Sequence, residues 1–526
     1  MAASSHHGRL TDADQVWLER QGVPLAEALR QLALLAGPRA HILLERPCAL
    51  GDGIEVIAGE ELESLARHHD QAAREGRLLS FVPASGLASR MFTELLAYRD
   101  RAGDLALSDL DAQIAVDRPE ARAFRAFLDG LHLLAFRDEL KTALSHRGLD
   151  LDQVASSGPY RALLESLLST PGLGYEQIPK GLVAFHRYAD GPRTPIEEHL
   201  VEAAGLVKDG DDRCRLHFTV PASHEGVFAA RLQQVRTRYE TRFGVRYQVD
   251  LSTQHPGTDT LALDSDGSPL RNADGRLVLR PSGHGALLEN LDGLRADIVL
   301  IKNIDNVAPD RLKGPTFTWA KALTGRLIEL QARIRAMALR LEEGSDPSAE
   351  RDATEFAVEV LHRHVPTPRG RSSAQAREEI LEILDRPIRV CGVVPNRGEP
   401  GGGPFWVRYS DGSTCPGIVE AAEVDRAATG QAELFAKATH FNPVFMACGL
   451  RDRHGKPHDL RRFVDDSAVI VTTKRFAGRE ITTLERPGLW NGGMARWHTF
   501  FVEVPLEVFN PVKTVNDLLR PQHQPG

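Results

Sequence analysis

The apolar side chains of this 526-residue chain recur with two spacings, and the alternation of the two predicts its architecture. In residues 119–148 and in "GPYRALLESLLSTPG" they stand three and four positions apart, which predicts amphipathic helices. Further along, the short apolar runs "GLVAFHRY", "CRLHFTVP" and "RYQVDLS" alternate with the helical patterns "PIEEHLVEAAGLV" and "HEGVFAARLQQVRTRYETRFG". Such alternation is typical of a parallel sheet covered by helices.

The patterns divide the chain into four expected parts. Residues 1–75 predict an N-terminal helical extension, and residues 76–340 predict an α/β core that a helical insertion interrupts at about 95–175. Residues 341–385 predict a helical connector, and residues 386–526 a β-rich C-terminal part. We therefore expect an α/β protein whose central sheet is built from segments far apart in the sequence.

Polar and glycine-rich stretches mark the expected turns. The tight-turn signals "DSDG" and "NADG" flank short strand patterns, which indicates a hairpin excursion. The long helical pattern "PTFTWAKALTGRLIELQARIRAMALRLEEG" leads into a polar stretch near residues 344–352, where we expect a hinge. A glycine run, "PNRGEPGGGPFWVRYSDGS", lies within the β-rich part.

Composition narrows the function classes. The chain has 64 Lys and Arg residues against 72 Asp and Glu residues, and no basic stripe with interleaved aromatic residues, which argues against polymeric nucleic acid as a partner. We find no signal-peptide pattern at the N-terminus and no apolar stretch of membrane-spanning length, so we expect a cytoplasmic protein without membrane partners. Five scattered cysteines without CxxC spacing argue against a disulfide framework and a zinc site: Cys48, Cys214, Cys391, Cys415 and Cys448.

A loop of small residues, "ASGLASR", follows an apolar strand pattern and precedes a helical one. Unpaired N–H groups at such a turn attract anions, Gly86 allows close approach, and the hydroxyl groups of Ser85 and Ser89 add donors. Arg90 adds a forked positive charge suited to phosphate. Lys180, just before a predicted strand, is a second candidate phosphate contact. A tight turn with a surface arginine, and a solvated lysine, are the structural alternatives.

The stretch "VLIKNIDNV" places Asp305 after an apolar strand, near the carboxyl end where ligands of open α/β sheets gather. A carboxylate there is unfavourable unless it meets a cation, so Asp305 is a candidate Mg²⁺ ligand. The alternative is an aspartate that caps the next turn. Asn442 in "ATHFNPV" is a second metal-side candidate, although a buried asparagine commonly bonds the backbone instead.

Three further stretches carry candidate ligand contacts. In "RPSGHG", Gly283, His284 and Gly285 precede a helix, so the chain can lie flat against a planar or phosphorylated ligand, although a plain turn is equally compatible. Asn491 in "LWNGG" stands among aromatic and glycine residues that suit a sugar or base pocket, or an ordinary turn. Lys513 in "FNPVK" is a further candidate phosphate contact.

Taken in order, these stretches resemble the nucleotidylyltransferases that make nucleotide sugars, most closely the UDP-sugar and UDP-N-acetylglucosamine pyrophosphorylases. The whole chain also resembles a related bacterial family without an assigned activity. In this resemblance "ASGLASR" matches the phosphate loop, with Ala88 in place of a usual glycine. Lys180 matches the lysine that follows the loop, ninety positions (180 − 90) beyond Arg90, and Gln254 in "STQHPG" matches a glutamine-containing loop.

The resemblance continues downstream. "RPSGHG" matches the uridine-facing loop, "NIDN" the metal-side aspartate, "ATHFNPV" a second metal-side residue and "FNPVK" a phosphate lysine. It implies a nucleotide-diphospho-sugar transferase-like, Rossmann-like α/β fold with a mixed sheet, a helical insertion and a β-rich C-terminal lobe that completes the sugar and phosphate site.

The implied reaction is in-line attack by a sugar 1-phosphate on the α-phosphorus of a nucleoside triphosphate, with UTP favoured and Mg²⁺ as cofactor. Arg90 and Lys180 would offset phosphate charge, and no general base is needed because the attacking phosphate is already ionised. One alternative is a glycosyltransferase of related fold, against which Arg90 and Lys180 argue. The other is a regulator that binds a nucleotide sugar without catalysis, for which Ala88 is the hint.

Overall fold

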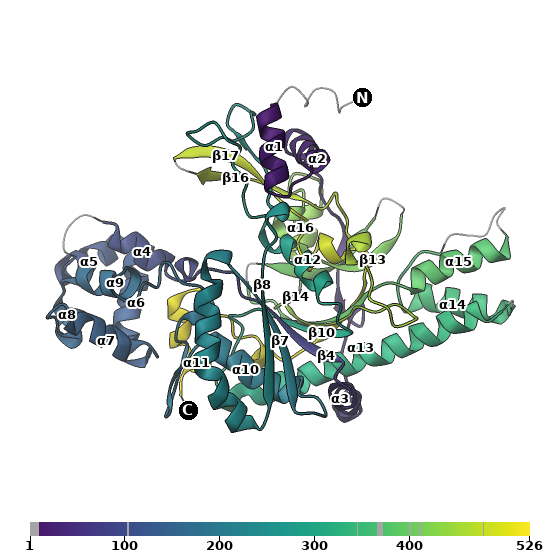
Figure 1. Cartoon of the computed structure of the whole chain (residues 1–526), viewed down its shortest axis with the longest axis horizontal. Coiled ribbons are helices and arrows are strands. Elements are labelled where there is room, and N and C mark those ends of the chain that lie inside the picture. The colour runs from purple at the N-terminus through teal and green to yellow at the C-terminus, as the bar shows by residue number, and fades with distance from the viewer. Residues whose placement is uncertain are drawn as a thin grey trace. The chain divides into compact units, whose positions relative to one another are not determined.

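The computed structural model describes residues 10–101, 105–344, 346–365, 372–398, 401–409, 412–476 and 478–525. Spatial proximity groups the chain into two units, whose course is coloured by residue number in Figure 1. Unit 1 comprises Met1–Ala72, Gln254–Ile301 and Ala320–Val504, and unit 2 comprises Ala73–Thr253, Lys302–Trp319 and Pro505–Gly526. The four-part division expected from the sequence stays a prediction.

Unit 2 contains three parallel strands in the order β4 (Leu78–Pro83), β7 (Arg213–Val220) and β8 (Arg246–Thr253). Helices α10 (Pro195–Leu206) and α11 (Glu225–Phe243) lie beside β7 and β8 (Figure 1). The predicted alternation of helices and parallel strands is therefore confirmed over residues 195–253.

The strand expected at "GLVAFHRY" is wrong. Residues Lys180–Leu182 form a 3-10 turn, and only His186–Tyr188 (β5) is extended, in a two-stranded hairpin with β6 (Gly191–Arg193). The apolar run Val183–Phe185 is buried in the same hydrophobic cluster as the helical insertion. A short apolar run has the same sequence pattern whether it is a buried strand or a segment packed against helices.

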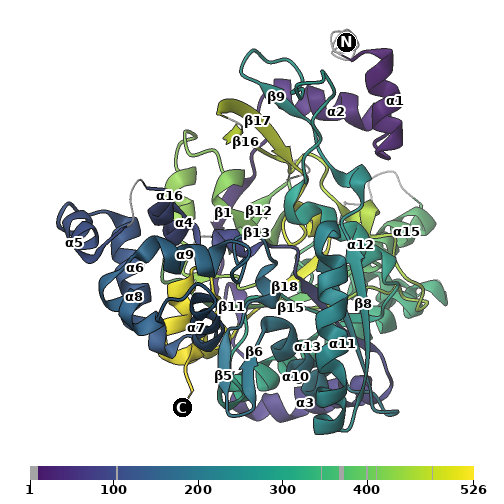
Figure 2. The same ribbon diagram turned by 60° about the vertical axis from the view of Figure 1, so that its left-hand side comes forward.

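The helical insertion expected at about 95–175 consists of helices α4 to α9, which share one aromatic core. The ring of Phe124 lies 4.7 Å from that of Tyr98 and 5.3 Å from that of Tyr160. Val515 and Leu518 of the C-terminal segment belong to the same cluster, and Figure 2 shows that segment beside the insertion. The insertion is thus packed into unit 2 through a common core.

Unit 1 contains a mixed sheet with strand order β2-β3-β18-β11-β15-β10. Strand β11 (Ile388–Pro395) runs parallel to β18 (His498–Glu503) and antiparallel to β15 (Phe445–Gly449). Two three-stranded sheets, β1-β12-β13 and β16-β17-β9, complete the β-rich part. The predicted α/β class with a mixed sheet and a β-rich C-terminal region is confirmed.

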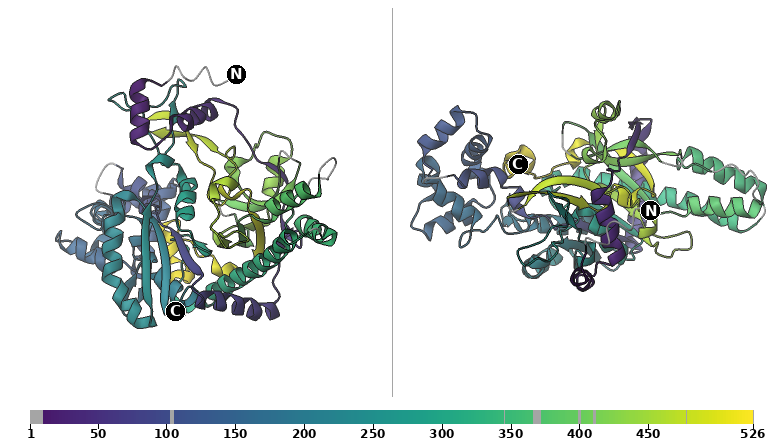
Figure 3. Two further views of the ribbon diagram at one scale, coloured as in Figure 1. Left: turned by 45° about the vertical axis from the view of Figure 1, so that its right-hand side comes forward. Right: turned by 90° about the horizontal axis from the view of Figure 1, so that it is seen from above.

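A hinge is expected near residues 344–352, where helix α13 has ended at Glu342 and α14 begins at Pro347. Residues 343, 344 and 346 between them are not helical, and residue 345 lies outside the described residues. Helix α14 begins at Pro347 because Asp346 caps it, accepting a hydrogen bond from the Ser348 N–H, and proline suits the first helical position. Figure 3 shows α14 (Pro347–Glu359) and α15 (Ser373–Leu384) side by side. The polar residues here include the start of α14, and the hinge stays a prediction.

The remaining elements are bounded as follows. The helices are α1 (Asp12–Arg20), α2 (Leu25–Ala36), α3 (Gly59–Arg74), α4 (Thr93–Arg99), α5 (Leu107–Ala115), α6 (Pro119–Gly130), α7 (Arg137–Ser145), α8 (Leu151–Ser157), α9 (Tyr160–Leu168), α12 (Leu287–Gly293), α13 (Lys313–Glu342) and α16 (Gln431–Ala436). The strands are β1 (Leu43–Pro47), β2 (Ala49–Leu50), β3 (Gly53–Glu55), β9 (Ala262–Asp264), β10 (Ile298–Lys302), β12 (Gly402–Arg408), β13 (Thr414–Glu420), β14 (His440–Phe441), β16 (Ile470–Phe476) and β17 (Arg479–Glu485).

All five cysteines are free and buried. In the part of the chain that the structure describes, no helix is long and apolar enough to cross a bilayer.

Candidate functional site

The segment after strand β10 is anchored on both sides within unit 2. The Ile304 N–H donates to the carbonyl oxygen of Pro83 at the end of β4, at 3.2 Å. The carbonyl oxygen of Asp305 accepts from the Val512 N–H, also at 3.2 Å, and the side chain of Asn306 accepts from the Asn510 N–H at 2.8 Å. The backbone of the strand-end aspartate is thus held between β4 and the C-terminal segment.

The side chain of Asp305 pairs with a lysine. Lys180 Nζ lies 2.9 Å from Asp305 Oδ2 and donates a second hydrogen bond to the Val512 carbonyl oxygen at 2.8 Å. The two charged side chains keep 12% and 21% of their exposure, so solvent or a ligand can reach them. An ammonium group has three N–H donors, so one remains for a ligand oxygen. Asp305 therefore pairs with a cation and does not cap the next turn.

Lys180 reaches the small-residue loop despite the insertion between them. The Lys180 N–H donates to the Gly86 carbonyl oxygen at 3.0 Å, and the Ala88 N–H donates to the Ile178 carbonyl oxygen at 2.9 Å. The next residue, Gly181, packs closely, since a Cβ there would lie 3.2 Å from Ile304 Cγ1. The loop, the lysine and the aspartate thus form one cluster in unit 2.

Ala88 is fully buried in the hydrophobic core of the insertion. Its methyl group packs there, and its N–H already bonds Ile178, so this amide does not face a ligand. The alanine in place of a glycine is therefore explained by packing. Residues Ala88–Arg90 form a 3-10 turn and α4 begins only at Thr93, so the loop opens onto a tighter turn than the predicted helix.

The remaining phosphate candidates of unit 2 face outward to different degrees. Arg90 is exposed, and its guanidinium group forms no ion pair with any described residue. Ser85 and Ser89 are partly buried, and Gly86 is exposed. Lys513 is exposed, with its backbone N–H bonded to the Asp517 side chain at 2.8 Å. Arg90 and the loop residues around Gly86 are therefore accessible to an anionic ligand.

The candidate base-binding residues come together in unit 1. Gln254 Nε2 donates to the Gly283 carbonyl oxygen at 3.3 Å, and Gly283 adopts a left-handed conformation, with φ at +74°. The ring of His284 stacks on Trp490, with centroids 4.2 Å apart. Burial lowers the pKa of His284 below its ordinary value, which favours the neutral ring. The "RPSGHG" and "LWNGG" stretches thus form one aromatic surface, with Gly285 at the base of the loop against the Pro487 carbonyl oxygen.

Two asparagines of unit 1 differ in what occupies their amide groups. Asn442 donates to the Gly392 carbonyl oxygen at 3.2 Å and accepts from the Val444 N–H at 3.0 Å, which is the backbone-bonded alternative. Its role toward a metal stays a prediction. Asn491 donates to Glu423 Oε2 at 2.7 Å, while its Oδ1 is buried without a hydrogen-bond partner among the described residues.

The residues present fit a magnesium ion held jointly with substrate. No group of three or more His, Cys, Asp or Glu side chains in the described part of the chain is arranged to hold a metal by itself. Mg²⁺ in phosphoryl-transfer sites is commonly held by one or two carboxylates together with substrate phosphates. Asp305 Oδ1 forms no hydrogen bond within the described residues, so one carboxylate oxygen remains for such an ion.

A buried charge network next to this cluster was missed from the sequence. Glu202 accepts two hydrogen bonds from Lys302 Nζ, both at 2.9 Å, and Lys313 Nζ lies 2.9 Å from Glu198. Burial raises the pKa of Glu202, but the two ammonium groups lower it further, and the net shift is downward. Acidic residues in the first turn of a helix commonly act as caps, and Glu197 does so here. The sequence pattern therefore did not indicate that the acidic side chains near it are buried and paired with lysines.

Comparison with known proteins gives one family and several distant structures. The family model described as "Domain of unknown function (DUF4301)" matches residues 11–524. A search of curated proteins finds no match.

Among solved structures, the chain is similar to a uridine diphosphate N-acetylglucosamine pyrophosphorylase from Trypanosoma brucei, with a TM-score of 0.45 and 13% identity, covering 96% of this chain and 76% of that one. It is also similar to a protein described as UDP-glucose phosphorylase from Trypanosoma brucei, with a TM-score of 0.43 and 13% identity over 97% and 80% of the two chains. A variant UDP-glucose pyrophosphorylase from Leishmania major matches with a TM-score of 0.42 and 14% identity over 97% and 79%. Such distant likenesses leave the chemistry of this chain to be inferred from its own residues.

Proposed function

The chain belongs to the DUF4301 family, and we propose that it is a nucleotidylyltransferase that forms a nucleotide sugar and pyrophosphate from a nucleoside triphosphate and a sugar 1-phosphate. The observation that carries this proposal is the cluster of Lys180, Asp305 and the Gly86 loop in unit 2. It sets a lysine and a carboxylate beside a small-residue loop that bears an exposed arginine, Arg90. These are the groups that an anionic triphosphate with a divalent cation requires.

The chemistry needs positioning and charge neutralisation. A phosphate oxygen of the sugar 1-phosphate attacks the α-phosphorus of the triphosphate, a new P–O bond forms, and the bond to pyrophosphate breaks. The free donor of Lys180 and the guanidinium group of Arg90 would offset the negative charge on the phosphoryl group and the leaving pyrophosphate. Lys513 would add a further contact.

Asp305 would hold the Mg²⁺ ion through the carboxylate oxygen that Lys180 does not contact. When bound, this ion neutralises the phosphates and polarises the reacting phosphoryl group. Until substrate binds, Lys180 compensates the Asp305 charge, which keeps a partly buried carboxylate paired. When the phosphates and the ion bind, we therefore expect Lys180 to pair with a phosphate oxygen and Asp305 to pair with the ion.

The aromatic surface of unit 1 supports the nucleotide part of the proposal. His284 on Trp490, with Gln254 and Gly283 behind it, offers a flat face and amide groups of the kind that recognise a base. Asn491, one residue beyond Trp490, is the candidate for the sugar. UTP is the preferred triphosphate because the sequence motifs resemble those of uridylyl enzymes.

The decisive experiment incubates the full chain with Mg²⁺, a panel of triphosphates headed by UTP, and hexose or amino-sugar 1-phosphates, and measures pyrophosphate release. We expect a nucleotide sugar, reversal when pyrophosphate is added, and loss of both directions on chelation of Mg²⁺. Binding of nucleotide sugars without pyrophosphate exchange would instead identify a regulator. Transfer of sugar from a nucleotide sugar to an acceptor would identify a glycosyltransferase.

A further inference from the structure

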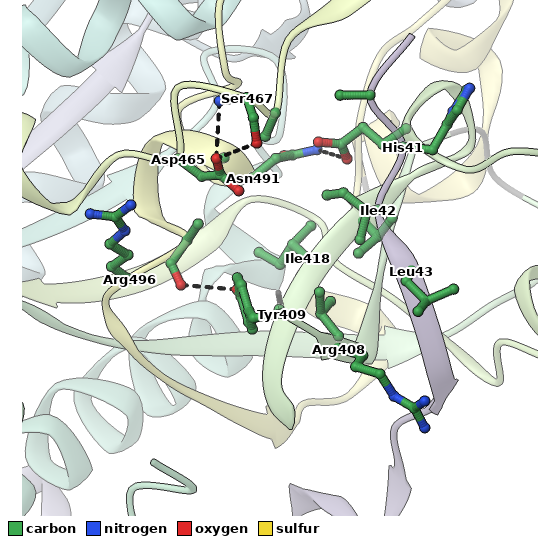
Figure 4. Close-up of a pocket in the computed structure, with 18 of the residues that line it drawn as sticks. His41, Ile42, Leu43, Arg408, Tyr409, Ile418, Asp465, Ser467, Asn491 and Arg496 are labelled. Carbon is green, nitrogen blue, oxygen red and sulfur yellow. Dashed lines mark hydrogen bonds between the residues drawn. The ribbon is translucent and has the colours of Figure 1, made fainter. Parts of the chain in front are cut away.

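Unit 1 contains a pocket with a volume of about 650 Å³, and of its lining residues the proposed reaction uses only Asn491, the candidate sugar contact. It lies among strands β1, β12 and β13 and the segments 465–469 and 491–496. In Figure 4, Arg496 lies on one side of the pocket and the apolar Ile42 and Leu43 on the other, with Tyr409 and Ile418 between them. None of its lining residues belongs to unit 2, which holds Arg90, Lys180 and Asp305.

The pocket is rich in guanidinium groups that lack acidic partners. Among its lining residues are five arginines and only two carboxylates, Glu423 and Asp465. Arg408 pairs with Glu45. The other four form no ion pair with any carboxylate in the described part of the chain: Arg363, Arg386, Arg389 and Arg496.

The hydrogen bonds of these arginines go to neutral groups. Arg389 is 1% exposed and donates to Thr499 Oγ1 at 2.9 Å and to the Trp490 carbonyl oxygen at 2.5 Å. Arg363 donates to Cys415 Sγ at 3.4 Å and to the Trp497 carbonyl oxygen, while its buried Nε has no partner among the described residues. Buried guanidinium groups bonded only to neutral partners keep their charge uncompensated.

The pKa of Arg386 reflects the resulting excess of positive charge. Burial and then the nearby charges of Arg363 and Arg496 lower the pKa of Arg386 to about 10. The two carboxylates do not balance this excess. Burial raises the pKa of Glu423 to about 7, so about half of it is uncharged at pH 7. Asp465, which accepts hydrogen bonds from the Ser467 N–H and hydroxyl group, supplies one negative charge against four arginines without an acidic partner.

Two further buried polar atoms at the pocket lack partners. Glu423 Oε1 and Asn491 Oδ1 form no hydrogen bond with any described residue, although each side chain is about nine-tenths or more buried. A neighbouring cavity of about 410 Å³ also borders Arg386 and Arg496, but its lining has five carboxylates against four arginines. The excess of positive charge therefore belongs to the larger pocket.

We infer that this pocket of unit 1 is a binding site for a small organic phosphate, whose phosphate group meets Arg386 and Arg496 and whose apolar body packs against the Ile42 side. Guanidinium groups bind phosphate in a bidentate manner, and several arginines together attract the doubly charged phosphate of a monoester more strongly than a monoanion. The apolar residues opposite Arg496 exclude a bare inorganic ion as the best ligand. The site lies outside the proposed catalytic cluster and would serve a ligand other than the reacting phosphates.

The test is calorimetric titration of the full chain with phenyl phosphate, which joins a phosphate to an apolar ring, at fixed ionic strength. Arg496→Gln and Arg386→Gln should each weaken binding at least tenfold. Arg335→Gln, at an exposed position of α13, and Arg90→Ala should leave the affinity unchanged. Arg496 is itself exposed, so its replacement should not disturb folding, which circular dichroism checks.

Inorganic phosphate should bind more weakly than phenyl phosphate, and benzoate more weakly still. The inference is overturned if the unaltered chain does not bind phenyl phosphate at millimolar concentration, or if both pocket variants keep full affinity. Loss of binding only in Arg90→Ala would place the probe in unit 2 and also overturn it. Equal affinity for benzoate would overturn the assignment to phosphate.

Discussion

Lys180 Nζ lies 2.9 Å from Asp305 Oδ2, although 125 residues separate the two in the chain. Each charge compensates the other, and the Val512 carbonyl oxygen fixes the ammonium group from a third segment. Since both side chains are partly exposed, the pair can open toward a ligand that brings its own charges. The relationship makes separate predictions for the two residues.

Asp305→Asn is expected to abolish nucleotide-sugar formation while the chain stays folded. The amide keeps the shape and an acceptor for Lys180 but loses the charge that would hold Mg²⁺, and such a loss lowers rates by orders of magnitude. Pyrophosphate release and a Mg²⁺ titration measure the effect, with circular dichroism as the control. Near-normal turnover with an unchanged Mg²⁺ optimum would remove Asp305 from the metal site.

Arg90→Ala and Lys180→Ala should each reduce kcat/KM for the triphosphate, because a lost charged phosphate contact weakens the transition state by about 2–4 kcal/mol. Matched controls are Arg118→Ala and Lys141→Ala, two exposed positions of the insertion. Steady-state kinetics of pyrophosphate release measures kcat/KM for each variant and its control. A silent Lys180 variant would refute the phosphate role of that lysine, and a silent Arg90 variant that of the loop.

Glu202→Leu should destabilise the folded chain by about 3–5 kcal/mol, because it leaves the buried Lys302 ammonium without its carboxylate. Urea unfolding measures the change. Adding Lys302→Met should recover much of the loss, since no unpaired charge then remains at that position. Lys208→Met, at a largely exposed pair with Asp212, should change little, and an equal loss there would show that burial is not the cause.

Glu423 should make stability fall as pH rises. Burial raises its pKa from 4.5 to about 7, so between these values the folded chain holds a proton that the unfolded chain has released. The free energy of unfolding therefore decreases by about 3 kcal/mol across this range and is level outside it.

Glu423→Gln should flatten this fall, because glutamine still accepts from the Asn491 amide and the Glu420 N–H but does not titrate. Unfolding curves at several pH values between 4.5 and 8 test the prediction. Glu433→Gln, at an exposed position of α16, is the control and should retain the slope of the unaltered chain. A slope that survives in Glu423→Gln would assign the titration to another group.

Local sequence patterns predicted the helices and strands correctly where the apolar residues of a segment had a single clear spacing. The helices and parallel strands of residues 195–253 follow from their spacing, because each pattern spans a whole element. The strand expected at residues 181–188 failed, since its apolar run packs with helices. The hinge expected near residues 344–352 stays a prediction, and its polar pattern coincides in part with the capped start of α14, because a capping aspartate and a proline also start helices.

Only part of the candidate site could be predicted from the sequence. The individual residues Lys180 and Asp305 stand out by their sequence context, but their distance depends on how the chain folds back, which no local pattern encodes. The arginines of the unit 1 pocket come from four separate segments, and each alone resembles a solvated side chain. In the first turn of α10, Glu197 and Glu198 resemble ordinary caps, and the burial of Glu198 becomes evident only from its pairing with Lys313, which is distant in the sequence.

The chain leaves the strand region of unit 2 at Gly86 and returns at Lys180, and the backbones of these two residues are hydrogen-bonded at 3.0 Å. The residues between them thus form one long loop whose two ends are in contact. The entropic cost of closing a loop rises only slowly with its length, so this contact costs little more for the ninety-odd residues it closes than it would for a loop of half that length. The position of Lys180 is therefore set by the contact that closes the loop and by the core that the insertion shares with unit 2.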